Sequence, residues 1–355
     1  MRIPESVLTR ATEIVPDADV LIAGRSTLLG IAPQGRVSAG GATRMFPTLT
    51  DWCALTLSRP DDVAAVPALV SGEATDPWLA VQDWAARRSA VEVLERARLL
   101  GLPVAALGEA ESDVPRVIGC GTAGPARSVS GLLVVDLTSM WAGPLCGRLL
   151  AAAGATVVKV ESPTRPDGTR AGNRVFFDWM NTGKLSYSID FDDERLRALL
   201  TVADVVLEGS RPSALVRRAL SPHDVAPSPG RVWVRVTGYG TDGDNAEQVA
   251  FGDDAAVAGG LVGWRDGSPE FLGDALADPL AGLAAYEAAV EALSRGGGLL
   301  VEVSMAAVAA TYASLPATPV IDVAPDLPSV EPASELGADN AAIERLVVER
   351  SLTAC

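Results

Sequence analysis

The stretch from Gly131 to Glu161 constrains the fold more than any other part of this sequence. Leu132–Leu137 is a short apolar run of the kind found in strands buried on both faces, and Thr156–Val160 is a second one. Between them the pattern predicts a helix that Pro144 starts and Gly154 ends. Together these signals predict one βαβ unit, whose crossover should be right-handed.

Short apolar strands alternate with helical segments through the rest of residues 131–305, which predicts an α/β fold with a Rossmann-like, mostly parallel sheet. Residues 1–110 indicate a smaller α/β domain of their own. Residues 111–130 are rich in Gly, Ser and Pro and are interpreted as a linker. Residues 306–355 are expected to form a C-terminal extended tail and helix.

Composition excludes several classes of function. The 355 residues carry a net charge of −16, which argues against a nucleic-acid partner because such proteins need a basic surface. No apolar run approaches the ~18 residues that would predict a membrane span, and the N-terminal segment has no export signal. We therefore expect a cytoplasmic protein with no membrane partner.

The residues that most often hold metals are scarce. The four cysteines, Cys53, Cys120, Cys146 and Cys355, are far apart and form no CxxC pair, so neither a zinc site nor a disulfide framework is indicated. His223 is the single histidine, which leaves little for a metal cluster or a histidine-based triad. No metal is expected.

Asp278 is the main candidate for chemistry. It stands at the start of the predicted helix Pro279–Leu293, where the helix dipole and the free N–H groups favour a carboxylate. An Asp followed by Pro is also an ordinary helix cap, so both roles stay open. A carboxylate can act as a covalent nucleophile, and Asp274 is the alternative.

Other candidates follow predicted strands. Gly238 and Tyr239 come directly after the strand Arg231–Thr237, where a glycine lets the backbone approach a ligand closely. Polar groups also stand just outside strands, at Asn181, Lys184 and Arg211. Taken alone, each of these is more often a solvated surface residue than a site residue.

Seven segments within about residues 131–305 carry a family resemblance. They are VVDLTSMWAGPLCGRLLAAAGATVVKVE, PDGTR, MNTGKLSYSID, ADVVLEGSRPSAL, RVWVRVTGYGTDG, DALADPLAGLAAYEAAVEAL and GGGLLVEVSM. In this order they resemble the class III CoA-transferases (CaiB/BaiF), the family of formyl-CoA transferase, carnitine CoA-transferase and α-methylacyl-CoA racemase.

The resemblance implies an enzyme that moves CoA from an acyl-CoA to a carboxylic acid, with Asp278 as the nucleophile and no tightly bound cofactor. CoA or acyl-CoA would be the substrate, and the protein would be a homodimer. The implied CoA-binding residues are Met140, Trp141, Ala142, Glu161, Asn181, Lys184, Arg211, Gly238 and Tyr239.

The order of the domains differs from that of the family. Residues 38–110 resemble the small domain that normally follows the last strand, so the chain looks rearranged, with Gly40 and Gly41 in the place of the family's mobile glycine loop. The racemase branch has a histidine in a Gly-His-Asp segment, whereas this chain has Gly252-Asp253-Asp254. Racemisation is therefore less expected, and a degenerate member that binds CoA or a partner without turnover is the main alternative.

Overall fold

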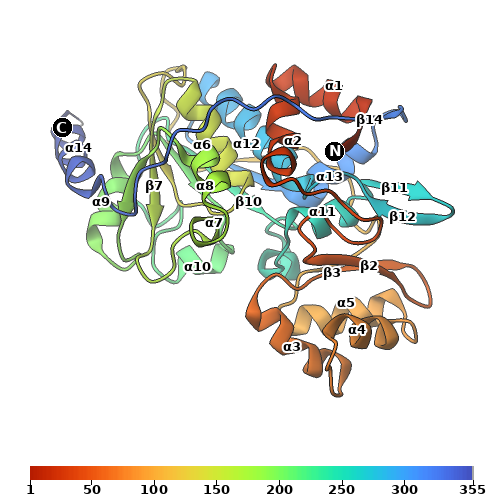
Figure 1. The fold of residues 1–355 in the computed structure, drawn as a ribbon. Helices are drawn as coiled ribbons and strands as arrows, with labels where there is room; N and C mark the ends of the chain where they lie inside the picture. Colours follow the sequence, from red (N-terminus) through yellow and green to blue (C-terminus); the bar gives the residue numbers. More distant parts are fainter. Residues whose placement is uncertain (354–355) are drawn as a thin grey trace. The chain divides into compact units, whose positions relative to one another are not determined.

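The structure, a computed structural model, describes residues 1–353 (Figure 1). They form two units, each built from three segments of the chain. The first unit comprises Met1–Val114, Gly238–Leu280 and Ser304–Leu327, and the second comprises Pro115–Thr237, Ala281–Val303 and the residues from Pro328 onwards. The sequence predicts consecutive domains instead (1–110, 111–130, 131–305 and 306–355), and that assignment stays a prediction. Cys355 lies outside the described residues.

The second unit contains a seven-stranded sheet with the order β5-β13-β10-β9-β6-β7-β8. The neighbours β10–β9, β9–β6, β6–β7 and β7–β8 run parallel, which confirms the mostly parallel sheet of the predicted α/β fold. The strands are β5 (Arg116–Gly119), β6 (Leu133–Asp136), β7 (Thr156–Glu161), β8 (Leu185–Ser188), β9 (Val205–Glu208), β10 (Val232–Thr237) and β13 (Leu299–Ser304).

The predicted βαβ unit consists of β6, helix α6 (Ala142–Ala152) and β7, and Leu133 pairs with Thr156 in its register. The core of the unit joins strand residues such as Val135 and Val158 to α9 (Glu194–Val202) and α14 (Asn340–Thr353). These two helices are far apart in sequence and lie side by side (Figure 1). Burying one such valine or leucine side chain contributes about 1.5–3 kcal/mol.

One strand lies inside the segment interpreted as a linker. β5 pairs antiparallel with β13, with Arg116 opposite Glu302, and the two side chains form an ion pair of 2.6 Å. Most of its residues are exposed because it is an edge strand. Such a strand has no apolar alternation, so composition alone does not distinguish it from a linker.

The first unit contains a three-stranded antiparallel sheet of β2 (Thr43–Pro47), β3 (Trp52–Thr56) and β4 (Val104–Ala106). Residues of α3 (Pro60–Val70), α4 (Pro77–Ala85) and α5 (Ala90–Leu99) share one apolar core with β2, β3 and β4. This arrangement agrees with the α/β character expected of the N-terminal region.

The remaining helices and strands complete the two units. In the first unit they are β1 (Arg2–Pro4), α1 (Glu5–Ile14), α2 (Ala18–Leu29), η1 (Gly243–Glu247), α11 (Gly252–Ala258), β11 (Val262–Arg265), β12 (Ser268–Phe271), α13 (Met305–Ala313) and β14 (Val320–Asp322). In the second they are α7 (Gly168–Ala171), α8 (Arg174–Asn181) and α10 (Pro212–Val216). Helix α12 (Ala277–Ser294) begins in the first unit and continues in the second. Within residues 1–353, none of the helices combines the length and the apolar character of a membrane span.

Candidate active site

Asp278 lies in the first turn of α12 and contacts the start of another helix. Its Oδ2 atom accepts a hydrogen bond of 3.1 Å from the backbone N–H of Gly252, the first residue of α11. A Cβ atom at position 252 would lie 2.4 Å from this oxygen and 2.4 Å from the carbonyl oxygen of Ala275. Only a glycine therefore permits the observed approach of the carboxylate.

The surroundings of Asp278 disfavour its charged form. Burial raises the pKa of Asp278 to about 7, the guanidinium of Arg25 opposes this shift, and the negative charge of Asp253 adds to it. The side chain nevertheless keeps a partly exposed surface. A carboxyl group with these properties is close to half ionised at neutral pH, as a nucleophile or an acid–base group requires.

Asp274, the alternative carboxylate, has a different environment. It is fully buried, and its Oδ1 atom forms an ion pair of 2.5 Å with Nη1 of Arg25 in α2. Its Oδ2 atom has no hydrogen-bond partner among the described residues. Burial raises the pKa of Asp274, and Arg25 opposes the shift. Asp274 thus fixes the position of the Arg25 guanidinium. Asp278, in contrast, is partly exposed.

Two further carboxylates belong to this cluster, and the sequence did not predict either as a site residue. Asp253 accepts hydrogen bonds from the N–H of Ala275 at 3.0 Å and from the hydroxyl of Thr43 at 3.4 Å. Asp254 accepts one of 2.7 Å from the hydroxyl of Thr56. Burial raises the pKa of Asp253 to about 6 and that of Asp254 to about 8. Their sequence signal, two acidic residues at a helix start, is also that of an ordinary helix N-terminus.

The predicted glycine loop lies beside this cluster. Ser38 and Thr43 close the loop through a backbone hydrogen bond of 3.0 Å, and Gly41 has a φ of +76° that favours glycine. A Cβ atom at Gly40 would lie 3.8 Å from Nη2 of Arg25. The structure therefore brings Gly40, Arg25 and Asp274 together in the first unit, while the mobility of the loop stays a prediction.

The predicted CoA-binding turn lies in the second unit, after β6. Met140 is 42% exposed and has a φ of +73°, a strained conformation for a side chain of this size. Its N–H donates a hydrogen bond of 3.1 Å to Asp167, which also pairs with the buried ammonium of Lys159 at 2.9 Å. Trp141 and Ala142 are buried. The turn therefore presents Met140 to solvent and holds it by an ionic network.

Three of the other predicted CoA-binding residues form ion pairs or hydrogen bonds with groups of the second unit itself. Lys184 is buried and donates to Asp136 at 2.9 Å, to Asn181 at 3.0 Å and to the carbonyl oxygen of Pro144 at 2.8 Å. These bonds use all three donors of an ammonium group. Glu161 is also buried and pairs with Arg170 at 2.6 Å.

The remaining three predicted CoA-binding residues have other surroundings; they are Arg211, Gly238 and Tyr239. Arg211 is exposed at the start of α10. Gly238 and Tyr239 belong to the first unit, where the hydroxyl of Tyr239 donates a hydrogen bond of 3.1 Å to the carbonyl oxygen of Val104. Burial raises the pKa of Tyr239 well above its ordinary value.

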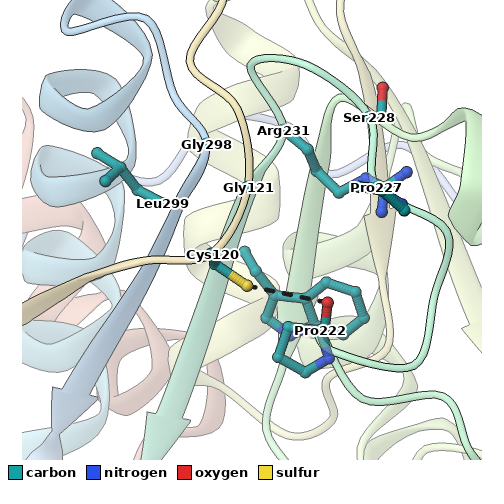
Figure 2. A pocket seen from close by; sticks show the side chains of 9 residues that line it. Cys120, Gly121, Pro222, Pro227, Ser228, Arg231, Gly298 and Leu299 are labelled. Carbon is teal, nitrogen blue, oxygen red and sulfur yellow. Dashed lines mark hydrogen bonds between the residues drawn. The ribbon is translucent and has the colours of Figure 1, made fainter.

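A cavity of about 20 Å³ in the second unit has room for about one water molecule. Figure 2 shows the thiol of Cys120 on one side, 3.8 Å from the carbonyl oxygen of Pro222, with Arg231 and Leu299 nearby. Arg231 and Leu299 stand where β10 and β13 begin, whereas ligands of such sheets bind outside the carboxyl ends of the strands. The cavity is too small and wrongly placed for a CoA site.

About half of the chain is similar to known CoA-transferases. It is 30% identical over 200 residues to the succinyl-CoA:D-citramalate CoA-transferase of Chloroflexus aurantiacus. The alignment covers 51% of this chain and 50% of that protein. It is 32% identical over 194 residues to the probable fatty acyl-CoA transferase Rv3272 of Mycobacterium tuberculosis, with 48% of each chain covered. The chain thus spans about half the length of the curated relatives it matches.

Two solved structures are similar to about half of the chain. The crystal structure of Rv3272 from Mycobacterium tuberculosis has a TM-score of 0.48 at 30% identity, covering 53% of this chain and 56% of that one. A CAIB/BAIF family protein from Brucella suis also has a TM-score of 0.48, at 28% identity, covering 54% and 56%. The model of the CoA-transferase family III matches residues 129–324, more than half of the chain and including Asp278. The chain belongs to the CoA-transferase family III.

Proposed function

We propose that this protein transfers CoA from an acyl-CoA to a carboxylic acid, with Asp278 as the covalent nucleophile. The observation that carries the proposal is the environment of this residue. Its carboxylate is held by the N–H of Gly252, its surface is partly exposed, and burial raises its pKa to about 7. A helix cap needs none of these properties, whereas a nucleophile needs a fixed and incompletely solvated carboxylate.

The proposed reaction has two symmetrical halves. The Asp278 carboxylate attacks the thioester carbonyl, which forms a mixed anhydride and releases the CoA thiolate. The thiolate then attacks the carbonyl carbon of Asp278, which forms an aspartyl-CoA thioester and releases the donor as a carboxylate. The acceptor carboxylate attacks the aspartyl carbonyl of this thioester, which forms a second mixed anhydride and releases the CoA thiolate. The thiolate then attacks the acceptor's acyl carbon, which forms the new acyl-CoA. The Asp278 carboxylate is regenerated, and no redox step occurs.

Binding of CoA by the second unit stays a prediction. Met140 and Arg211 are exposed, so we propose that they contact CoA directly. The buried groups Lys184, Asn181 and Glu161 support the same region through their ion pairs and hydrogen bonds. Homodimer formation and a cytoplasmic location likewise stay predictions.

The experiment that tests the function is intact-protein mass spectrometry. The full-length protein is mixed with acetyl-CoA, succinyl-CoA or oxalyl-CoA, and samples are quenched over time. The expected result is a mass increase that corresponds to an acyl or a CoA adduct and disappears on addition of a carboxylic acid. If no donor gives an adduct, the covalent transfer is wrong.

The pH dependence of adduct formation gives a further prediction. Burial raises the pKa of Asp278 to about 7, and only the carboxylate is nucleophilic. The rate of adduct formation should therefore rise with pH, by about tenfold between pH 6 and pH 8, and become constant above that. A rate that is already constant from pH 5 upwards would contradict this assignment, because it would require an Asp278 with an ordinary pKa.

Gly252→Ala is expected to slow adduct formation by about 100-fold, because its Cβ would meet the Asp278 carboxylate at 2.4 Å and displace it. The same overlap should lower the free energy of unfolding by about 1–3 kcal/mol. Gly72→Ala is the matched control, since a Cβ at Gly72 meets nothing within 4 Å and its φ is not positive. Equal rates for the two variants would show that the Gly252 contact does not position the nucleophile.

The alternative is a family member that binds CoA or a partner without turnover. The observation in its favour is that Lys184, Asn181 and Glu161 are engaged by other groups of the protein. This alternative predicts a shift in melting temperature with CoA but no adduct from any donor. A racemase is disfavoured, because Asp253 stands where that branch has its histidine.

A further inference from the structure

The turn that follows β6, residues 138–140, has a backbone conformation that is unusual for methionine. Met140 has a φ of +73°, which residues other than glycine rarely adopt. Its side chain is 42% exposed, so the burial of an apolar group in a core does not account for this conformation. Strain of this kind persists only where neighbouring groups fix the backbone, and it is concentrated at sites that bind ligands.

A buried ion pair fixes this turn at two points. The carboxylate of Asp167 accepts a hydrogen bond of 3.1 Å from the N–H of Met140. The ammonium of Lys159 donates to the carbonyl oxygen of Thr138, and the two charged groups pair with each other at 2.9 Å. Thr169 holds the other oxygen of the carboxylate, because its N–H and its hydroxyl donate to Oδ1 of Asp167 at 3.0 and 2.7 Å.

Neither member of the pair is accessible to a ligand, since the side chains of Lys159 and Asp167 are 2% and 0% exposed. Burial alone would raise the pKa of Asp167, but the ammonium of Lys159 and the N–H of Thr169 lower it below its ordinary value, so the carboxylate is charged. A buried ion pair adds little stability over apolar side chains of similar size, because both charges lose their hydration. Its distinct contribution here is the fixed geometry of the turn.

The turn and Asp167 lie at the edge of the sheet where ligands bind. β6 and β7 are parallel neighbours, with Asp136 opposite Lys159. The turn follows β6 and Asp167 follows β7, so both lie beyond the carboxyl ends of their strands, as ligands do in open α/β sheets. A Cβ at Gly168 would lie 3.5 Å from Sδ of Met140. The exposed methionine therefore lies beside the residue that directly follows Asp167.

We propose that Asp167 and Lys159 are positioning residues of the CoA subsite. They hold the turn from Thr138 to Met140 in the conformation that binds CoA, and they act through the backbone of Met140 without touching the ligand. The inference rests on the proposed function, because the contact between Met140 and CoA belongs to that proposal.

Isothermal titration calorimetry of the full-length protein with free CoA tests the proposal by comparing Asp167→Asn in two backgrounds. With Met140 present, the variant loses the ion pair and the acceptor that fixes the positive φ, so CoA should bind at least about tenfold more weakly. In the Met140→Gly background the positive φ is free of strain, so the same substitution should weaken binding by about threefold or less. A loss due to general destabilisation would not depend on residue 140.

Two further variants separate the turn from the fold. Asp167→Asn leaves the ammonium of Lys159 buried without its partner, so Asp167→Asn/Lys159→Met, which removes both charges, should give the same pattern in the two backgrounds. Asp204→Asn is the matched control. Asp204 accepts a backbone N–H from Leu133 at 2.8 Å and pairs with Arg127 at 2.6 Å, but at the amino end of β6. This variant should bind CoA as the wild type does, and unfolding curves identify any variant that is misfolded.

The outcomes separate this inference from the proposed function. Normal CoA affinity in Asp167→Asn, or an equal loss in both backgrounds, would overturn the inference, while an adduct in the wild type would leave the transferase standing. CoA affinity that depends on Asp167 through residue 140, in a protein that forms no adduct, would support the inference and overturn the transferase. A wild type that does not bind CoA overturns the inference, and the adduct measurement then decides the transferase by itself.

Discussion

Asp278→Ala is expected to reduce CoA transfer by more than about 10³-fold and to remove the covalent adduct from the mass spectrum. Loss of a covalent nucleophile has effects of this size because no other group can take over the first step. A helix cap alone would cost only about 1 kcal/mol of stability and no specific chemistry. The bond from Gly252 to the carboxylate, at 3.1 Å, joins α12 to α11, so the variant also removes a contact between two helices.

Asp278→Asn separates the chemical effect from the structural one. Burial raises the pKa of Asp278 to about 7, so the folded state prefers the neutral carboxyl group, and the stability that this preference provides is lost as the pH rises through about 7. At pH 8 the asparagine variant should therefore be at least as stable as the wild type in thermal unfolding, yet inactive.

Asp274→Asn is the matched control, because it changes the neighbouring carboxylate of the same cluster. It should still form the adduct from an acyl-CoA. If Asp274→Asn loses the adduct while Asp278→Ala keeps it, the nucleophile is Asp274. If both variants keep transfer, no aspartyl intermediate forms in this protein.

The central part of the fold could be predicted because the sequence patterns that mark its strands and helix lie within short segments. Strands buried on both faces leave unbroken apolar runs, as in β6 and β7, and the glycine and proline at the ends of α6 mark its limits. β5 could not be predicted, since an edge strand with exposed side chains has no such run. The grouping of residues 238–280 with the N-terminal segment could not be predicted either, because apolar periodicity shows that an element is buried but not which sheet it packs against.

The candidate site is also only partly predictable, because a sequence pattern does not show which distant residues come into contact. Asp278 could be proposed from its position at a helix start and from the family resemblance of the segment around it. Arg25 could not, because it pairs with a residue 249 positions further along the chain, and spacing within one sequence carries no information on such a contact. Lys184 is the opposite case, since a lysine beside a strand suggests a solvated group, whereas the folded chain buries it.

Lys184→Met is expected to lower the free energy of unfolding by about 3–5 kcal/mol, because it leaves the carboxylate of Asp136 buried without its partner. Both side chains are almost fully buried, and the ion pair measures 2.9 Å. Burial alone would raise the pKa of Asp136, but the ammonium groups of Lys184 and Lys159 lower it below its ordinary value. Urea unfolding of both proteins measures the loss, and a change below about 1 kcal/mol would show that Asp136 is stabilised by other groups.

The double variant Asp136→Leu/Lys184→Met should recover most of that stability, because it removes the buried charge together with its partner and fills the space with apolar groups. It also tests the predicted contact of Lys184 with CoA in a protein that folds. If CoA binds to the double variant as tightly as to the wild type, the side chain of Lys184 acts only by holding Asp136, Asn181 and the carbonyl oxygen of Pro144. If the double variant is stable but binds CoA at least about tenfold more weakly, the ammonium group contributes to the CoA site, since the scaffold would then be intact and only the charge would be missing.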